Sequence, residues 1–172
     1  MKKIDNPMTM VKLDKIVLHI SVGNDWNRLQ GANKLLESLT QRKIITKNAK
    51  TTIKNFNISR NSPTSCMVTL RKKEAADMLS NSFKAVGDKL KLSSFDNKGN
   101  FGFGIAEHLD LPGVDYDPDI GIFGMDVIVA LKRPGWRIKK RKYLRSNLPR
   151  KLNISPEEAA SFIKNEFNIE VI

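Results

Sequence analysis

The segment KLDKIVLHISV, residues 12–22, decides the fold because its apolar and other side chains alternate. Strict alternation places every second side chain on the same side of an extended chain, so the segment predicts a strand with one buried face. That face would carry Ile16, Leu18, Ile20 and Val22. Gly23-Asn24-Asp25 then interrupts the strand, and apolar residues at helical spacing predict a helix that ends near Leu39.

Further elements follow on both sides of this strand. The alternation recurs in three segments, which we expect to be strands: residues 66–71, 101–105 and 125–132. A second helix should end near Gly87, and Ser155-Pro156-Glu157-Glu158 combines the N-cap, N1 and N3 residues typical of a helix start. Strands outnumber helices without alternating strictly with them. We therefore expect an α+β fold, with an antiparallel-rich β-sheet, helices packed on one face and long basic loops.

The length of 172 residues suits a single domain. Within it we expect an N-terminal arm at 1–11, a basic loop at 46–62 and a basic arm or loop at 133–153. A single cysteine, Cys66, excludes a disulfide framework and a thiolate zinc cluster. No apolar run approaches the ~20 residues of a membrane helix, and the first ten residues lack the apolar core of a secretory signal. We expect no membrane association.

The net charge of +12 is concentrated in two stretches without any acidic residue. Residues 38–73 contain nine Lys and Arg, residues 127–156 contain ten, and the remainder of the chain has a net charge of −7. A charge run is commonly only a solvated surface. Because no carboxylate within either stretch neutralises its cations, a phosphate-binding surface is the favoured interpretation.

The predicted sheet and the second basic stretch both have features of an RNA surface. The face opposite the core would carry Lys15, His19, Ser21, Thr69 and Arg71, which could form an RNA platform or simply face solvent. Trp136 and Tyr143 lie among cations in RPGWRIKKRKYLR, residues 133–145, where aromatic rings can stack on unpaired bases. The alternative is that Trp136 anchors the arm to the core.

No pattern in the chain indicates catalysis, a cofactor or a metal. The FGFG sequence at 101–104 lacks the third glycine of a dinucleotide fingerprint and any Gly-Lys-Ser/Thr. Asp115, Asp117 and Asp119 match the first positions of a calcium loop, but Ile120 stands where that loop needs glycine. The two histidines have no ligand-spaced partner, and Cys66 falls on a core-facing strand position.

Six motifs together resemble one known family. They are NPM at 6–8, KIVLHISVG at 15–23, MVTLR at 67–71, GNFGFGIAEH at 99–108, DYDPDIGIFGMD at 115–126 and LKRPGW at 131–136. This set is similar to the universal large-subunit ribosomal protein family that is numbered five in bacteria and eleven in eukaryotes. The resemblance covers nearly the whole chain, and NPM and RPG resemble its eukaryotic and archaeal branch.

The resemblance implies a structural constituent of the large ribosomal subunit, not an enzyme. It implies binding to 5S rRNA and adjacent large-subunit rRNA in the central protuberance, and contact with P-site tRNA through a basic loop. Implied protein partners are the other 5S-binding ribosomal protein, universal number eighteen, and a small-subunit head protein. The implied location is the cytoplasmic ribosome, with assembly in the nucleus and nucleolus if the source is eukaryotic.

The resemblance also implies site residues. A family Asn aligns with His19, a family Gln aligns with Arg42, and the family Thr of the VTLR strand is present as Thr69. These three residues and Arg71 form the expected 5S rRNA site. The cations of the expected P-site tRNA loop are Lys47, Lys50, Lys54 and Arg60. The expected rRNA-binding arm contains Arg133, Trp136, Arg137, Lys139, Lys140, Arg141, Lys142 and Arg145.

Two other functions compete with this hypothesis. An RNA-processing, metal-dependent enzyme would use the aspartates at 115–119, although two-metal sites usually draw carboxylates from separate elements. An RNA-binding protein that acts off the ribosome would share the basic surface. Sedimentation with large subunits would separate the second alternative from a ribosomal role.

Overall fold

A five-stranded sheet forms the centre of the computed structural model, which describes residues 6–149 and 152–172. Its strand order is β2-β3-β1-β6-β5, and all neighbouring strands are antiparallel. The strands are β1 (Lys12–Ser21), β2 (Ile45–Asn48), β3 (Pro63–Leu70), β5 (Phe101–Ile105) and β6 (Met125–Lys132). The alternating segment at residues 12–22 forms β1, the middle strand of the sheet. Its buried face therefore defines the core for the whole sheet.

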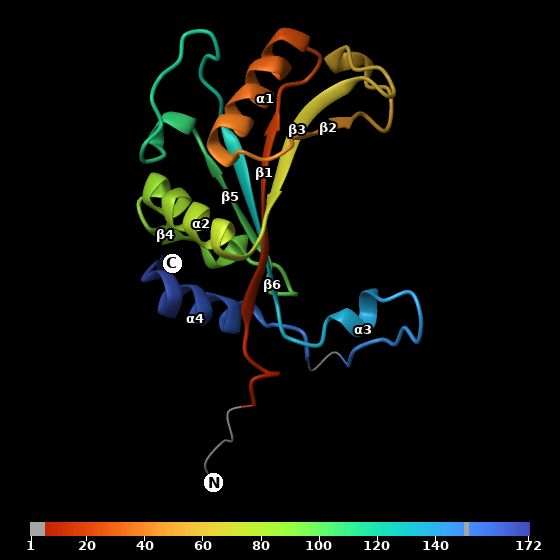
Figure 1. The fold of residues 1–172 in the computed structure, drawn as a ribbon, viewed down its shortest axis with the longest axis vertical. Coiled ribbons are helices and arrows are strands. Elements are labelled where there is room, and N and C mark those ends of the chain that lie inside the picture. Colours follow the sequence, from red (N-terminus) through yellow and green to blue (C-terminus); the bar gives the residue numbers. More distant parts are fainter. Residues whose placement is uncertain (1–5, 150–151) are drawn as a thin grey trace.

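The helices lie mainly on one side of this sheet. They are α1 (Trp26–Thr40), α2 (Lys72–Val86), α3 (Arg137–Lys140) and α4 (Pro156–Phe167). Figure 1 shows α1 and α2 against one face, α4 beside α2, and the short α3 projecting on the opposite side. The predicted α+β class, with an antiparallel sheet and helices on one face, is therefore confirmed.

The core lies between the sheet and these helices. Every second residue of the three middle strands is almost completely buried: Ile16, Leu18, Ile20, Cys66, Val68, Leu70, Val127, Val129 and Leu131. Phe83 of α2 stacks on Phe103 of β5, with ring centroids 5.4 Å apart, and meets Phe167 of α4 edge-on at 5.6 Å. These aromatic contacts bind α4 to α2 and β5, so both helices cover the same face.

Local signals place the helix ends where the sequence predicted them. The Ser155 side chain accepts a hydrogen bond from the Glu158 N–H, and the Glu158 carboxylate accepts one from the Ser155 N–H. This capping box satisfies two otherwise unpaired backbone donors. Helix α2 ends at Gly87, whose φ of +74° favours glycine.

The structure corrects the sequence prediction in three places. Strand β3 ends at Leu70, so Arg71 is the N-cap of α2 instead of the last strand residue. The segment at 133–153, expected as a basic arm or loop, contains a short helix, α3. Its residues 150–151, like residues 1–5 of the N-terminal arm, lie outside the described residues. The sequence patterns also gave no strand at 89–90, where β4 (Lys89–Leu90) pairs in parallel with β7 (Glu170–Val171).

Three single-turn 3₁₀ segments complete the secondary structure of the described residues. They are η1 (Lys54–Phe56), η2 (Leu92–Ser94) and η3 (His108–Asp110). The first lies within the expected basic loop and is important for the site below. The assignment of residues 1–172 to one domain stays a prediction.

Candidate nucleic-acid interface

Among the described residues, no helix packs along the middle strands on the face of the sheet opposite the core, and this face carries several predicted site residues. Val17 pairs with Thr69 on one side and with Ile128 on the other, so these three side chains form a row across the open face. His19 pairs with Met67 and with Asp126 in the next row. Thr69 and His19 therefore lie on one continuous surface, although they are 50 residues apart in sequence.

His19 is the most central of the predicted 5S rRNA residues. Its Nδ1 lies 3.4 Å from an Asp126 Oδ2, and both side chains are accessible to solvent. Gly104 of β5 lies beside Asp126, which leaves the strand backbone uncovered by a side chain on this face. The imidazole can thus hydrogen-bond an incoming polar group without moving a neighbouring side chain out of the way.

A shallow hollow beside β3 brings three of the four predicted 5S rRNA residues together. Arg42, Thr69 and Arg71 line it with Lys72, Lys73 and Glu74. Arg42 donates two hydrogen bonds to the Glu74 carboxylate, from Nη2 at 2.5 Å and from Nε at 3.2 Å. The bond from Arg42, helped by its positive charge, lowers the pKa of Glu74 below its ordinary value. Both side chains are about half exposed, so an RNA phosphate can reach the guanidinium.

The expected basic loop at 46–62 is partly strand, because Lys47 lies in β2, and its remainder connects β2 to β3. All its predicted cations are presented to solvent. Lys47, Lys50, Lys54 and Arg60 are exposed, and none has a carboxylate within salt-bridge distance among the described residues. The loop is nevertheless ordered by its own backbone. Ile53 and Ile58 exchange two backbone hydrogen bonds across η1, and Asn61 donates to the Ala49 carbonyl.

The tip of this loop also carries an aromatic residue that the sequence analysis missed. Phe56 ends η1 with its side chain 71% exposed, and Asn57 then turns the chain in the left-handed region with φ of 54°. A phenylalanine in this position contributes little to the core. Phe56 lies in an acid-free basic stretch, the same signal that singled out Trp136 and Tyr143, so sequence reasoning could have found it.

The basic arm is attached to the body through carboxylates from distant parts of the chain. At its start, Arg133 donates from Nη2 to a Glu158 carboxylate oxygen 2.7 Å away, and its side chain is only 12% exposed. Lys132 donates to Asp14, and Lys140 of α3 lies 3.9 Å from the same carboxylate. At the far end, Ile154 packs against Gly99 so closely that a Cβ there would lie 2.6 Å from the Ile154 side chain.

Beyond these attachments, the arm exposes its remaining predicted residues. Arg137, Lys139, Arg141, Lys142 and Arg145 are all exposed. Lys139 Nζ lies 5.0 Å from the centre of the Trp136 ring, and Lys142 Nζ lies 5.6 Å from the centre of the Tyr143 ring. Trp136 is partly buried and lines the clefts at the root of the arm, whereas Tyr143 is 76% exposed. The anchoring and stacking interpretations thus fit different aromatic residues.

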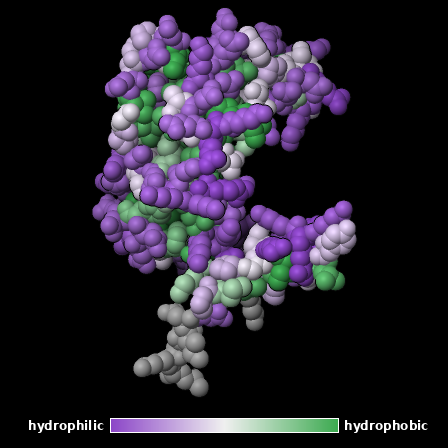
Figure 2. Space-filling view, viewed as in Figure 1, coloured by the Kyte–Doolittle hydropathy of each residue, from purple (hydrophilic) through white to green (hydrophobic). Residues whose placement is uncertain are grey.

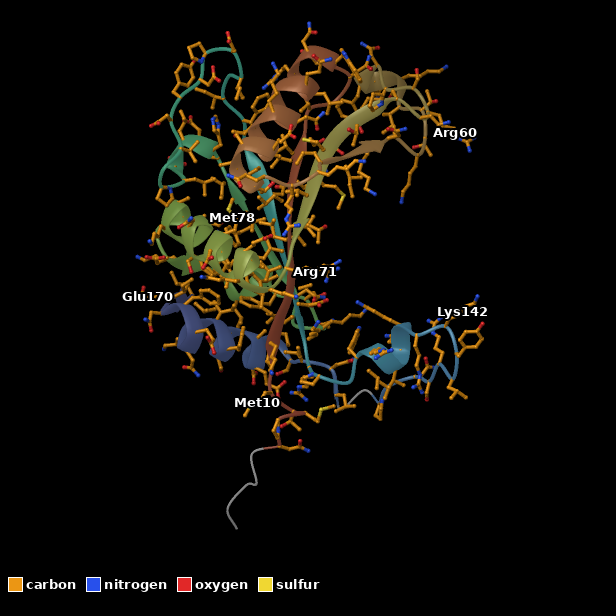
Figure 3. The ribbon with its side chains drawn as sticks, viewed as in Figure 1. Met10, Arg60, Arg71, Met78, Lys142 and Glu170 are labelled. Atoms are coloured by element: carbon orange, nitrogen blue, oxygen red, sulfur yellow. The ribbon has the colours of Figure 1, made fainter. Side chains whose placement is uncertain are left out.

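The loop and the arm border a concave surface. Figure 2 shows a deep notch on one side of the molecule, lined mainly by hydrophilic residues, between the upper body and the projecting arm. In Figure 3, Arg71 points into this notch, with Arg60 above it and Lys142 below. The cleft beside Arg71 is lined by Asp14, Lys132, Arg133, Trp136, Arg137 and Lys140. The structure therefore arranges residues from both basic stretches around one hollow.

One premise of the sequence analysis needs correction. The two basic stretches contain no acid, but carboxylates from elsewhere in the chain neutralise some of their cations. Glu74 pairs with Arg42, Glu158 with Arg133, and Asp14 with Lys132, Arg71 and Lys140. Sequence separation hid these pairs; Lys132 and Asp14, for example, are 118 positions apart. Free cations are concentrated in the 46–62 loop and the outer part of the arm.

Cys66 and His108, which could in principle carry chemistry, have structural roles in the fold. Cys66 is buried in the core, and this burial raises the pKa of its thiol to about 11. His108 is buried, and its Nδ1 accepts a hydrogen bond from the Phe123 N–H, which ties η3 to the segment before β6. Across residues 6–149 and 152–172, no three His, Cys, Asp or Glu side chains gather in a metal-binding cluster. No helix within the same residues has the length and apolar character needed to cross a membrane.

Comparison with known proteins identifies the family. Residues 6–58 match the family model described as ribosomal protein L5, and residues 63–166 match the model of the C-terminus of the ribosomal L5 family. The chain belongs to the ribosomal protein L5 family. It is therefore a structural, non-enzymatic protein, as the sequence predicted.

Individual relatives of the L5 family place the chain in its archaeal branch. It is 44% identical over 168 residues to the large ribosomal subunit protein uL5 of Sulfurisphaera tokodaii, covering 97% of this chain and 95% of the relative. It is 43% identical over 170 residues to uL5 of Sulfolobus acidocaldarius, covering 99% and 96%. A third uL5, from Methanoregula boonei, is 43% identical over 164 residues, which cover 95% of this chain and 99% of the relative.

Proposed function

We propose that this protein is a structural constituent of the large ribosomal subunit that binds 5S rRNA, adjacent large-subunit rRNA and P-site tRNA through three parts of one concave surface. The 5S rRNA site is the open sheet face with the hollow beside β3. The arm binds adjacent rRNA, and the 46–62 loop contacts tRNA. The observation that carries the proposal is the hydrophilic notch around which the cations of both basic stretches gather.

Side-chain chemistry supports the 5S rRNA site. Thr69 offers a hydroxyl, and Arg71 and Arg42 offer planar guanidinium groups that suit phosphate oxygens. His19 and Arg42 stand where the family has Asn and Gln, and both can still donate hydrogen bonds to RNA. Binding at Arg42 would require a phosphate to replace Glu74, which the exposure of this pair permits.

The tRNA contact is supported by the order and exposure of the loop. Its four cations can approach a polyanion from solvent without breaking an internal ion pair, and its backbone bridges limit the entropy lost on binding. Phe56 adds a flat apolar surface on which an unpaired or terminal base can stack. A contact of this type depends on shape and charge and not on base sequence.

The decisive experiment is a salt titration of 5S rRNA binding. Mobility-shift assays with 5S rRNA of Sulfolobus acidocaldarius should give a log–log slope of about −4 to −5 if about six phosphates are contacted. Arg71→Ala and Thr69→Ala should weaken binding. Lys84→Ala, which removes an exposed cation on the helix side of the sheet, is the matched control for a charge change. A slope near zero, or equal losses for Lys84 and Arg71, would overturn the proposed surface.

Assembly partners are tested separately. Contacts with the other 5S-binding ribosomal protein and with a small-subunit head protein stay predictions. Sucrose-gradient sedimentation of a cell extract should place the protein in large-subunit fractions, whereas an RNA-binding protein that acts off the ribosome would stay near the top. Cross-linking within those fractions should then join the 46–62 loop to tRNA and the arm to rRNA.

A further inference from the structure

Asp14 occupies an irregular position in the sheet. In the pairing of β1 with β6, Leu13 faces Leu131 and Lys15 faces Ala130, so Asp14 is an extra residue without a partner on β6. Such a β-bulge redirects the side chains next to it. Leu13 packs against the core and Ile16 is fully buried in it, so the bulge places both intervening residues away from the core. Asp14 is thereby directed to the surface that carries the notch.

Three cations from three separate elements converge on the Asp14 carboxylate. Lys132 at the end of β6 donates to Oδ1 at 2.5 Å, and Arg71 at the start of α2 has Nη1 3.5 Å from the same oxygen. Lys140 of α3 has Nζ 3.9 Å from Oδ2. Lys140 is the only one of the three that belongs to the projecting part of the arm. The carboxylate therefore links α3 to the sheet.

The carboxylate is nearly enclosed by this group, with a side-chain exposure of 9%. Burial by itself would raise the pKa of Asp14, but the hydrogen bond and charge of Lys132, with Lys140 and Arg71, lower it below its ordinary value. Asp14 is consequently ionised at neutral pH. Without its negative charge, three cations within one small cleft would repel each other and separate.

A buried carboxylate is unexpected in a surface that binds phosphates. Its own charge repels RNA, and an exposed acid in this position would only weaken binding. Asp14 instead occupies the centre of a cluster whose net charge stays positive, where it fixes the positions of its neighbours. A fixed set of cations binds a polyanion better than a mobile set, because less side-chain and backbone entropy is lost on binding.

We propose that Asp14 is a positioning residue: by joining Lys140 to Lys132 and Arg71, it holds the basic arm against the sheet in the geometry that binds rRNA. The RNA part of this proposal rests on the proposed function. The role of Asp14 in placing the arm concerns the free protein and can be tested without RNA. If Asp14 only repels RNA, removing its charge should raise rRNA affinity. If Asp14 positions the cations, removing its charge should lower rRNA affinity.

The first test measures arm mobility in the free, full-length protein. Chymotrypsin cleaves after exposed aromatic and leucine residues, and Tyr143 and Leu144 of the arm and Phe56 of the loop are such sites. Asp14→Asn should speed cleavage at 143–144 by roughly threefold to fivefold, the range expected for losing partly exposed ion pairs. Cleavage at Phe56, an internal control in the same molecule, should not change. Asp14→Glu should restore part of the protection.

The second test measures rRNA affinity with the same variants. Asp14→Asn should bind large-subunit rRNA with roughly threefold lower affinity, although it removes a negative charge from a phosphate-binding surface. The control is Asp77→Asn, which removes an exposed carboxylate of α2, on the helix side of the sheet, and should not weaken binding. Tighter binding by Asp14→Asn, with unchanged cleavage at 143–144, would overturn the proposal.

Other outcomes separate the two proposals. If the wild-type protein fails to bind rRNA, the proposed function fails, but the cleavage test still decides whether Asp14 places the arm. If Asp14→Asn does not fold, Lys140→Gln removes only the α3 partner and leaves the Lys132 hydrogen bond in place. It should speed cleavage at 143–144 while circular dichroism stays unchanged. Unchanged cleavage in Lys140→Gln would contradict the role of the cluster.

Discussion

The 46–62 loop and the 133–149 part of the arm are both rich in Lys and Arg, but their cations have different surroundings. In the loop, Lys47, Lys50, Lys54 and Arg60 are exposed and have no carboxylate nearby among the described residues. At the root of the arm, Arg133 and Lys140 pair with Glu158 and Asp14. The loop is ordered by its backbone, whereas the arm is positioned by side-chain ion pairs.

This difference concerns how each region could meet a polyanion. Free cations at the loop contribute their full charge as soon as a phosphate approaches, and their contacts should depend steeply on salt. Paired cations at the arm root contribute less charge, but they hold the outer cations in a defined place. The two regions therefore suit different contacts: an intermittent one for the loop, which we assign to tRNA, and a permanent one for the arm, which we assign to rRNA.

The largest expected effect comes from removing three cations from one region at a time. Arg137→Ala/Lys139→Ala/Lys142→Ala in the arm should lower rRNA affinity on the order of a hundredfold and reduce the log–log salt slope by about 2 to 3. Lys47→Ala/Lys50→Ala/Lys54→Ala in the loop removes the same charge. It should leave the rRNA slope nearly unchanged and impair tRNA binding to reconstituted subunits. Equal losses in both assays for both variants would refute the division of the surface.

The next-largest effect concerns the contact between Gly99 and Ile154, which attaches the far end of the arm to the body. Alanine at Gly99, where φ is +75°, would place a Cβ 2.6 Å from the Ile154 side chain. Alanine at Gly113 has a similar φ of +82° but meets nothing within 4 Å, so it is the matched control. Gly113→Ala should cost about 1–2 kcal/mol of unfolding free energy, and Gly99→Ala a further ~1–3 kcal/mol for overpacking. Urea unfolding measures the loss of unfolding free energy in both variants. Equal losses would mean that the Ile154 side chain moves aside for the added Cβ at no cost.

Each region also has one highly exposed aromatic residue, Phe56 in the loop and Tyr143 in the arm. Replacing each by alanine tests whether its ring stacks on a base. Phe56→Ala in the loop should weaken the tRNA contact by about 1–3 kcal/mol, and Tyr143→Ala in the arm should weaken rRNA binding by a similar amount. Neither should change the unfolding free energy, because both side chains face solvent. Phe56→Trp should retain binding, since a larger ring still stacks. Loss of stability in Phe56→Ala would show that the ring belongs to the fold instead.

Local sequence patterns predicted much of this fold. The alternation in Met125–Lys132 located β6 with its correct bounds and buried face, and Ser155 with Glu158 located the start of α4. These signals succeed because strand alternation and helix capping depend on neighbours within four residues. Helix α3 was missed because a four-residue helix has no detectable period, and β4 because a two-residue strand gains its stability from pairing; a short last strand was expected at 169–172, where β7 lies.

The site was less predictable for a related reason. The positions of the cations could be read from the sequence, but their ion pairs could not. Arg42 and Glu74 are 32 residues apart, and Asp14 reaches Lys132 only because of a bulge in the register between β1 and β6. Register and bulges depend on the pairing of distant strands. Sequence patterns alone therefore overestimated the free charge of both basic stretches.

The smallest expected effect is also the sharpest test of the comparison. Glu74→Gln and Asp14→Asn each remove one carboxylate that pairs with a predicted RNA-binding cation. Glu74 and Arg42 are about half exposed, so their pair does not fix other elements in place, whereas Asp14 is 9% exposed and joins three. Glu74→Gln should thus free Arg42 and raise 5S rRNA affinity about twofold, with no measurable change in urea unfolding. Because Asp14→Asn should lower large-subunit rRNA affinity, filter-binding of both variants to both RNAs separates a carboxylate that only competes with phosphate from one that positions its cations. The same direction of change in both would remove the distinction between the two kinds of ion pair.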